Sequence, residues 1–299
     1  MQTPSNPQVS GRGTVPIAAL RTKTRDVLTL LVRRDLVVKY QDSTLGYLWS
    51  LLEPLGMAVT YWFVFGIIYK ENKDGLPLHI VVGIFAWMWC QAAISESTKA
   101  LTTQATLITT IKAPRSIFPI SRVVARFAEY VAGIPIIVVF AIIFAQYANF
   151  NARLLWMILA IATQFVLLTG MALFLSSVNV LYTDIERMMR VVLRVLFYMA
   201  PVVYPLTKVT GIHSDSLKTC LKNGATAAPC HYGGLPGWGV RIYEYNPMVG
   251  IFQMYHHAWE RTAELPYTLV LKAMIGSFIV LGIGWWTFHK LEATVLKEL

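Results

Sequence analysis

Six long apolar runs repeat along the chain, and they constrain the fold more than any other feature. The hydrocarbon core of a bilayer is roughly 30 Å thick, so a spanning helix needs about 20 mostly apolar residues. In lipid the backbone can bond only to itself, so each run is expected to be helical. We predict an all-α polytopic membrane protein with six transmembrane helices, at residues 51–69, 79–93, 127–147, 154–175, 191–204 and 267–288.

Composition supports lipid as one of the solvents of this chain. Its 299 residues are 56% hydrophobic and 14% charged, whereas a soluble domain carries about 25% charged residues. The formal net charge is +10, but most basic residues lie between apolar runs. Membrane orientation therefore explains the charge better than nucleic-acid binding does.

The distribution of lysine and arginine indicates which way the chain crosses the membrane. Six spans place both termini on one side, and basic residues concentrate on the cytosolic side. Of the 26 lysines and arginines, 17 lie in residues 1–47, 99–126, 177–194 and 290–299, and 8 lie in the opposite connections. Lys272 falls within the last span. We expect both termini in the cytosol, even when the long loop 205–266 is left out.

The segment before the first span has the pattern of an amphipathic interface helix. Residues 1–22 are polar and read as a flexible cytosolic tail without the hydrophobic core of a cleavable signal. In residues 23–47, Leu28, Leu31, Val32 and Leu36 recur at helical spacing. Arg33 and Arg34 lie among them and supply positive charge. The helix either docks a cytosolic partner or anchors the chain at the interface.

The remaining organisation follows from this topology. Residues 48–290 form the transmembrane domain, with an outer region at 205–266, and residues 291–299 form a cytosolic C-terminus. Cys90 lies in an apolar run and is expected to be a buried small hydrophobe. Cys220 and Cys230 lie in the outer loop, where an oxidising compartment favours a disulfide. The alternative is two free thiols.

Catalytic and nucleotide-binding motifs are absent from the sequence. It has no P-loop, no H-E-x-x-H and no G-x-S-x-G. Carboxylates in the spans are nearly absent, Glu53 and Glu129 lying near inner ends, which argues against an ion-coupled carrier. His256, His257 and Glu260 lie on a predicted amphipathic helix at residues 247–260, but adjacent histidines point apart on a helix. We predict no metal, cofactor or catalytic residue in this chain.

Four segments in order resemble one transporter family. Residues 33–56 read RRDLVVKYQDSTLGYLWSLLEPLG. The family's entry element, Ser-x-Leu-Gly-x-Leu-Trp-x-x-x-x-Pro, is matched by Ser43, Leu45, Gly46, Leu48, Trp49 and Pro54. Asp42 stands where a basic residue is more usual. Segments 107–119, 178–188 and 200–205 with 245–252 match later parts. Over residues 25–290 the chain resembles the ABC type-2 polysaccharide exporter permeases, and it looks most like actinobacterial lipid-linked galactan exporters.

The resemblance implies a homodimer in the bacterial cytoplasmic membrane, bound to two copies of a separate ATPase that holds ATP and Mg²⁺. The expected cargo is a lipid-linked polysaccharide. One alternative is an ABC permease for a drug or small lipid. Another is a polyprenyl-dependent membrane glycosyltransferase, which would require clustered acidic residues that the loops lack.

The same resemblance assigns roles to residues. Contact with the ATPase is expected at Arg33, Arg34, Lys112, Pro114 and Arg115, and an outer gate at Pro201, Pro205, Asn246 and Pro247. The alternative for the first set is an ordinary loop. Aromatic side chains on the first and fifth spans either line a sugar channel or pack between helices; they are Tyr61, Trp62, Phe63, Phe65, Phe197, Tyr198 and Tyr204. The sequence assigns no role to residues 207–244.

Overall fold

The computed structural model describes residues 17–40, 46–68, 75–110, 113–144, 152–210, 236–260, 263 and 265–298. These residues are helical or lie in turns and short irregular connections, and they contain no strand. The elements are α1 (Ile17–Tyr40), η1 (Gly46–Leu48), α2 (Trp49–Trp62), the π-helical turn η2 (Phe63–Ile68), α3 (Leu76–Thr98), α4 (Ala100–Thr103), α5 (Ala105–Thr110), α6 (Ile117–Ile143), η4 (Ala152–Leu154), α7 (Leu155–Leu181), α8 (Asp184–Met199), α9 (Leu206–Thr210), α11 (Gly237–Tyr245), α12 (Pro247–Trp259) and α13 (Tyr267–Glu298).

Five helical segments in the described part are long and apolar enough to cross a membrane. They are Gly46–Ile68, Leu76–Thr98, Ile117–Ile143, Ala152–Leu181 and Tyr267–Val295. Each overlaps one of the predicted runs, and the spans Gly46–Ile68 and Ile117–Ile143 start earlier and end earlier than the runs predicted at 51–69 and 127–147. The predicted all-α polytopic fold is confirmed, with five qualifying spans where six were expected.

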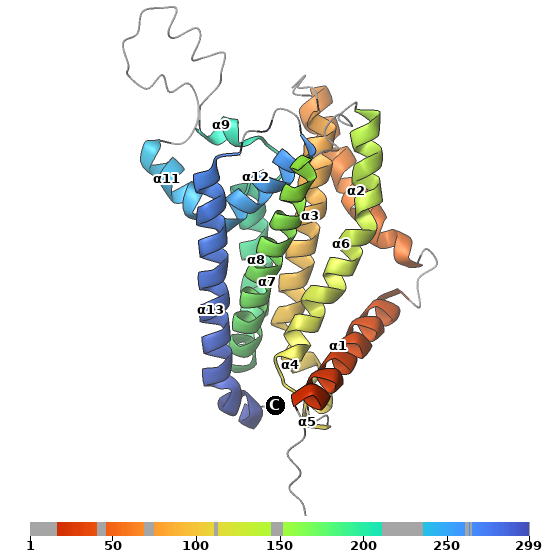
Figure 1. Ribbon diagram of the computed structural model, residues 1–299, viewed down its shortest axis with the longest axis vertical. Helices are drawn as coiled ribbons and strands as arrows, with labels where there is room; N and C mark the ends of the chain where they lie inside the picture. Colours follow the sequence, from red (N-terminus) through yellow and green to blue (C-terminus); the bar gives the residue numbers. More distant parts are fainter. Residues whose placement is uncertain are drawn as a thin grey trace, which may run out of the picture.

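The fifth predicted span is the one that differs. It corresponds to α8, which has only 16 residues and starts with Asp184 and Glu186 in its first turn. At 1.5 Å per residue it is about 24 Å long, shorter than the hydrocarbon core. Because Pro201 follows closely, a regular helix cannot continue. Figure 1 shows α8 beside α7, leading from the end of the bundle near α4 toward α9.

Helix α3 forms the centre of the bundle. In the most apolar part of the span Leu76–Thr98, 78% of the residues are buried, whereas only 11% are buried in the corresponding part of the span Gly46–Ile68. α3 packs against α2, α6, α7, α8 and α12, and Trp87 and Trp89 are both buried. The helix starts cleanly because Gly75 adopts φ 90° and Pro77 fits the first turn, where no amide donor is needed.

Helices α7 and α13 pack with their backbones unusually close. A Cβ added to Gly284 would lie 2.0 Å from the Gly170 carbonyl oxygen, and one added to Gly170 would lie 2.6 Å from Leu281 Cα. Only glycine permits such an approach, since glycine has no Cβ. The close backbone contact at these two glycines therefore fixes α13 against α7.

The two ends of the bundle differ in character (Figure 1). One end carries α1, α4, α5 and the last turns of α13, and the other carries α9, α11 and α12. The described part thus begins and ends at the same end of the bundle. Helix α1 leans against α6, and its predicted apolar stripe faces inward, with Leu31 buried.

Candidate translocation path, gate and coupling face

One face of α8 carries a stripe of exposed arginines. Arg187, Arg190 and Arg194 recur at helical spacing, and all three are exposed. Tyr198 continues the stripe and is 62% exposed. A charged side chain is costly against lipid tails, so such residues face water or another protein. This face of α8 is therefore suited to an aqueous path or to a subunit interface.

The predicted channel aromatics separate into two groups. Tyr61, Phe65 and Phe197 pack together, with ring centroids 6.3 Å apart for Tyr61 and Phe65 and 5.7 Å apart for Tyr61 and Phe197. Phe197 is buried and also meets Trp87 of α3 at 5.5 Å. These rings connect α2, α3 and α8.

The second group points outward from the same helices. Trp62 and Phe63 are 40% and 51% exposed on α2 and η2, and Tyr198 lies on the arginine-bearing face of α8. In a single subunit these outward rings have the exposure that contact with a translocated chain requires. Sugar rings stack on aromatic faces through their apolar sides, which would suit a channel for glycans. The channel role of these rings stays a prediction.

The proposed gate begins where α8 ends. α8 stops at Met199, and the following segment Ala200–Pro205 is irregular, with Pro201, Val202 and Val203 buried. Gly83 of α3 allows this segment to lie close, since a Cβ there would meet the Val202 carbonyl oxygen at 2.0 Å. The predicted break in the outer end of this helix is thus present, and it lies directly against α3.

Tyrosines connect this segment to α11. The Tyr204 hydroxyl donates to the Tyr198 carbonyl oxygen at 2.8 Å and lies 3.4 Å from the Tyr243 hydroxyl of α11. Burial raises the pKa of both phenols, so both stay protonated. α11 is thereby tied to the end of α8.

Asn246 and Pro247 form a sharp joint between α11 and α12. The Asn246 side chain accepts from the Met248 amide at 3.1 Å and caps α12, and Pro247 occupies the first turn. The helix predicted at residues 247–260 is confirmed as α12. Its predicted polar face is wrong at His256, which is 1% exposed because α12 packs between α3, α7 and α13.

The predicted coupling segment lies at the end of the bundle that carries α1. Pro114 is exposed, and Arg115 pairs with Glu292 of α13 at 2.9 Å. Arg33 and Arg34 are exposed on α1. Lys112 lies outside the described residues. The described members share one end of the bundle and offer basic charge there.

A buried charge network ties α1 to the bundle, and sequence reasoning missed it. Asp35 lies 3.0 Å from Arg34 and 3.2 Å from Arg122. Arg126, itself 2% exposed, pairs with Glu96 at 2.9 Å and with Glu129. Lys39 bonds Glu129 at 3.1 Å.

The sequence contained a signal for this network. Asp35 lies four residues after Leu31 and seven after Leu28, so it falls on the apolar stripe of α1. A carboxylate on that stripe requires a cationic partner inside the protein. Which cation pairs with it could not be read, because Arg122 lies 87 positions away.

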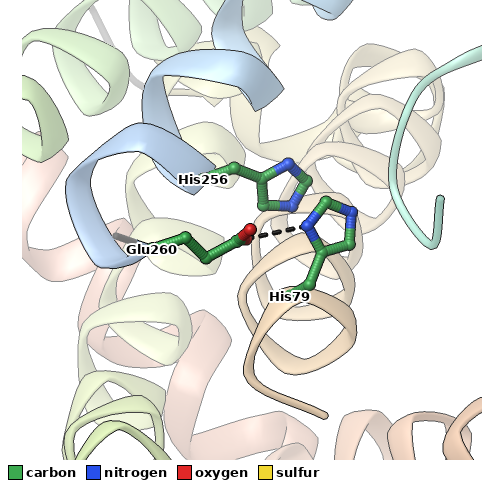
Figure 2. Close-up of side chains that lie close together, drawn as sticks. All are labelled: His79, His256 and Glu260. Carbon is green, nitrogen blue, oxygen red and sulfur yellow. Dashed lines mark hydrogen bonds and ion pairs between the residues drawn. The ribbon is translucent and has the colours of Figure 1, made fainter. Parts of the chain in front are cut away.

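A second cluster joins α3 and α12 at the opposite end. His79, His256 and Glu260 place ligand-type atoms within 4.8 Å of one another (Figure 2). The sequence had grouped His256 and Glu260 with His257 instead. His257 Nδ1 lies 2.7 Å from the Ala263 carbonyl oxygen, and His79 takes its place in the cluster. Cys220 and Cys230 lie outside the described residues, so their predicted disulfide stays a prediction.

The fold and these sites define a polytopic helical membrane protein with an interface helix at one end and short helices at the other. The profile of the ABC-2 type transporter family matches residues 26–213, more than half of the chain. The chain belongs to this family. It is accordingly the membrane subunit of a transporter rather than an enzyme, as predicted.

Comparison with curated proteins gives relatives of a single kind. An O-antigen export system permease protein RfbA of Klebsiella pneumoniae is 30% identical over 180 residues, which cover 60% of this chain and 69% of the relative. The protein of the same name from Myxococcus xanthus is 26% identical over 197 residues, which cover 66% and 75%. The predicted resemblance to polysaccharide exporter permeases is confirmed.

Proposed function

We propose that this chain is the permease subunit of an ATP-driven exporter that moves a lipid-linked polysaccharide across the cytoplasmic membrane. The cargo is a galactan-type cell-wall precursor or an O-antigen-like glycan. The observation that carries the proposal is the similarity to O-antigen export permeases over about two thirds of each chain. The sequence supplies no P-loop, so ATP hydrolysis falls to a partner.

The surface of α8 supports this kind of cargo. A lipid-linked glycan combines a charged phosphate linkage with sugar rings. Arg190 and Arg194 offer bidentate donors for phosphate oxygens, and Tyr198 on the same face offers a ring for stacking. A permease for an apolar drug would gain nothing from an arginine stripe in the middle of its pathway.

The exposed faces of α2 and α8 support a symmetric dimer. Large apolar side chains such as Trp49 and Val59 on α2 and Val191 on α8 are more than half exposed. Lipid can cover such residues on α2, but it cannot cover the arginines of α8. A second copy placed across α8 would enclose a path between the two stripes, with the lipid tail left outside.

The ATPase is proposed to dock at the end that carries α1 and the turn at Pro114. That end then faces the cytosol, with both termini inside. Arg115 and Glu292 join the docking turn to α13, so a push on the turn reaches the last span.

Export assays with paired variants test the proposal. The permease and its co-encoded ATPase are expressed in cells from which the native permease has been depleted, and surface glycan is measured against glycan retained inside. We expect wild type to restore export, and Arg194→Gln with Arg190→Gln to reduce it at least tenfold. Arg241→Gln, an exposed change on α11 at the end opposite the proposed docking face, is the matched control and should retain export.

Two outcomes would contradict the proposal. One is the absence of any nucleotide-binding subunit when the chain is purified from its native membrane. The other is normal surface glycan in depleted cells, since an exporter's loss must trap its cargo inside.

A further inference from the structure

Two buried imidazoles and a partly buried carboxylate from distant parts of the sequence meet near the α9–α12 end of the bundle. His79 lies in the first turn of α3, His256 in the last turn of α12, and Glu260 directly after that helix. His79 Nδ1 lies 2.8 Å from Glu260 Oε1, and the two imidazole rings stack with centroids 3.7 Å apart. Figure 2 shows the two rings next to each other, with the Glu260 carboxylate directed at His79.

Hydrogen bonding inside the protein leaves much of this cluster unsatisfied. His79 is 5% exposed and His256 is 1% exposed. Among the described residues, His79 Nε2 and both ring nitrogens of His256 have no hydrogen-bond partner. Buried polar groups normally find partners, so an imidazole with neither nitrogen bonded requires an explanation.

A metal binds the lone pair of a neutral imidazole nitrogen. Both ring nitrogens of the buried His256 side chain lack a hydrogen-bond partner among the described residues, so either one can take this role.

We infer that His79, His256 and Glu260 form a binding site for a divalent transition-metal ion, with Zn²⁺ as the best fit. Two imidazole nitrogens and one carboxylate oxygen are a donor set that zinc uses, with a fourth position left for water. His256 and Glu260 are four residues apart, so they fall on one side of the helix end. The ion takes the place of the proton between His79 and Glu260.

Small side-chain motions complete the geometry. Metal–ligand bonds of about 2.0 Å in a tetrahedron place ligand atoms about 3.3 Å apart. The ligand atoms here lie within 4.8 Å of one another, so no separation needs to close by more than about 1.5 Å. Glu260 lies just beyond the helix in extended backbone, and its side chain can move without breaking α12. Arg153 Nη1, 3.5 Å from the Glu260 carbonyl oxygen, adds a positive charge that opposes the ion.

A bound ion would pin the start of α3 to the end of α12. These are the helices that also hold the segment after α8, since Gly83 of α3 contacts Val202. The site is thus placed to fix the short outer helices against the central span. It is a property of this chain's own outer end and does not depend on the cargo.

Metal titration of the full chain tests the inference. The protein is purified in detergent without a metal-affinity step, stripped with a chelator and titrated calorimetrically with Zn²⁺. We expect one equivalent to bind to wild type and to raise its unfolding temperature. His79→Ala and His256→Ala should each weaken binding at least about a hundredfold. His257→Ala is the matched control, because it lies next in the chain and outside the cluster, and it should retain binding.

A second measurement does not depend on variants that fold. Co²⁺ bound to stripped wild type should give the visible absorption of a tetrahedral site with nitrogen and oxygen ligands, and Zn²⁺ should displace it. The inference is overturned if wild type binds no Zn²⁺ at 100 µM free metal. It is equally overturned if His256→Ala, folded by size-exclusion chromatography, binds as tightly as His257→Ala.

Discussion

Gly282 and Gly284 lie two residues apart on α13 and therefore on nearly opposite sides of the helix. Together they test how α13 is held against α7. Alanine at Gly284 would place its Cβ 2.0 Å from the Gly170 carbonyl oxygen and 2.8 Å from the carbonyl carbon. Alanine at Gly282 would meet no atom within 4 Å. The same chemical change thus meets backbone at one position and open surroundings at the other.

The cost at Gly284 follows from the distances. Ordinary contact begins at 3.4 Å, so α7 and α13 must separate by up to about 1.4 Å, and a gap of about 1 Å already forfeits up to half of each dispersion contact. Overpacking costs typically about 1–3 kcal/mol. Because the opposing atoms are backbone and cannot rotate away, we expect about 3 kcal/mol or more. At about 2 °C per kcal/mol for a chain of this size, the unfolding temperature should fall by roughly 6 °C or more.

The assay is thermal unfolding in detergent, followed by the fraction of protein that stays monodisperse on size-exclusion chromatography. Gly282→Ala should be neutral or gain up to about 1 kcal/mol from its better helix propensity. Equal unfolding temperatures for the two variants would refute the close packing of α7 on α13.

Three further expectations follow from other contacts. Asp35→Asn removes a buried charge that Arg122 faces and should lower stability by about 3–5 kcal/mol, whereas Asp26→Asn on the exposed side of α1 should be neutral; equal melting curves would contradict the network. Asn246→Ala deletes the cap of α12 and should cost about 0.5–2 kcal/mol, with Asn246→Asp as a variant that retains it. Arg115→Ala breaks only a part-exposed ion pair, worth about 1 kcal/mol or less, so it should leave the unfolding temperature unchanged while lowering ATP-driven export; full export would speak against coupling through this turn.

Much of the helical framework could be predicted because its causes are local. In lipid the backbone must satisfy itself within one segment, so apolar length alone locates α2, α3, α6, α7 and α13. Terminal signals are also local, as with Pro201 after α8 and Asn246 before α12. The span predicted at residues 191–204 shows the limit of this reasoning. It contains an arginine and ends in a proline-rich segment, and the structure has a short helix there, α8, rather than a full span.

The candidate sites were predicted less completely. Residues with local signatures, such as Pro201, Asn246 and Pro247, end or begin helices as such signatures predict, and their role in a gate stays a prediction. The aromatic set did not behave as one group, because Phe197 is buried against Trp87 while Tyr198, its neighbour, faces outward. Adjacent residues on a helix point in directions about 100° apart, so their surroundings depend on which helices pack on each side.

The sequence by itself determined that this chain is a helical membrane protein, roughly where five of its spans lie, and which family it belongs to. Hydrophobic length, charge bias and short motifs act within one segment, so they can be read in one dimension. Only the tertiary structure decided that Asp35 meets Arg122, that Gly170 meets Gly284, and that His79 meets His256. These pairs lie between 87 and 177 positions apart, and their contacts arise from the packing of whole helices, which no local pattern encodes.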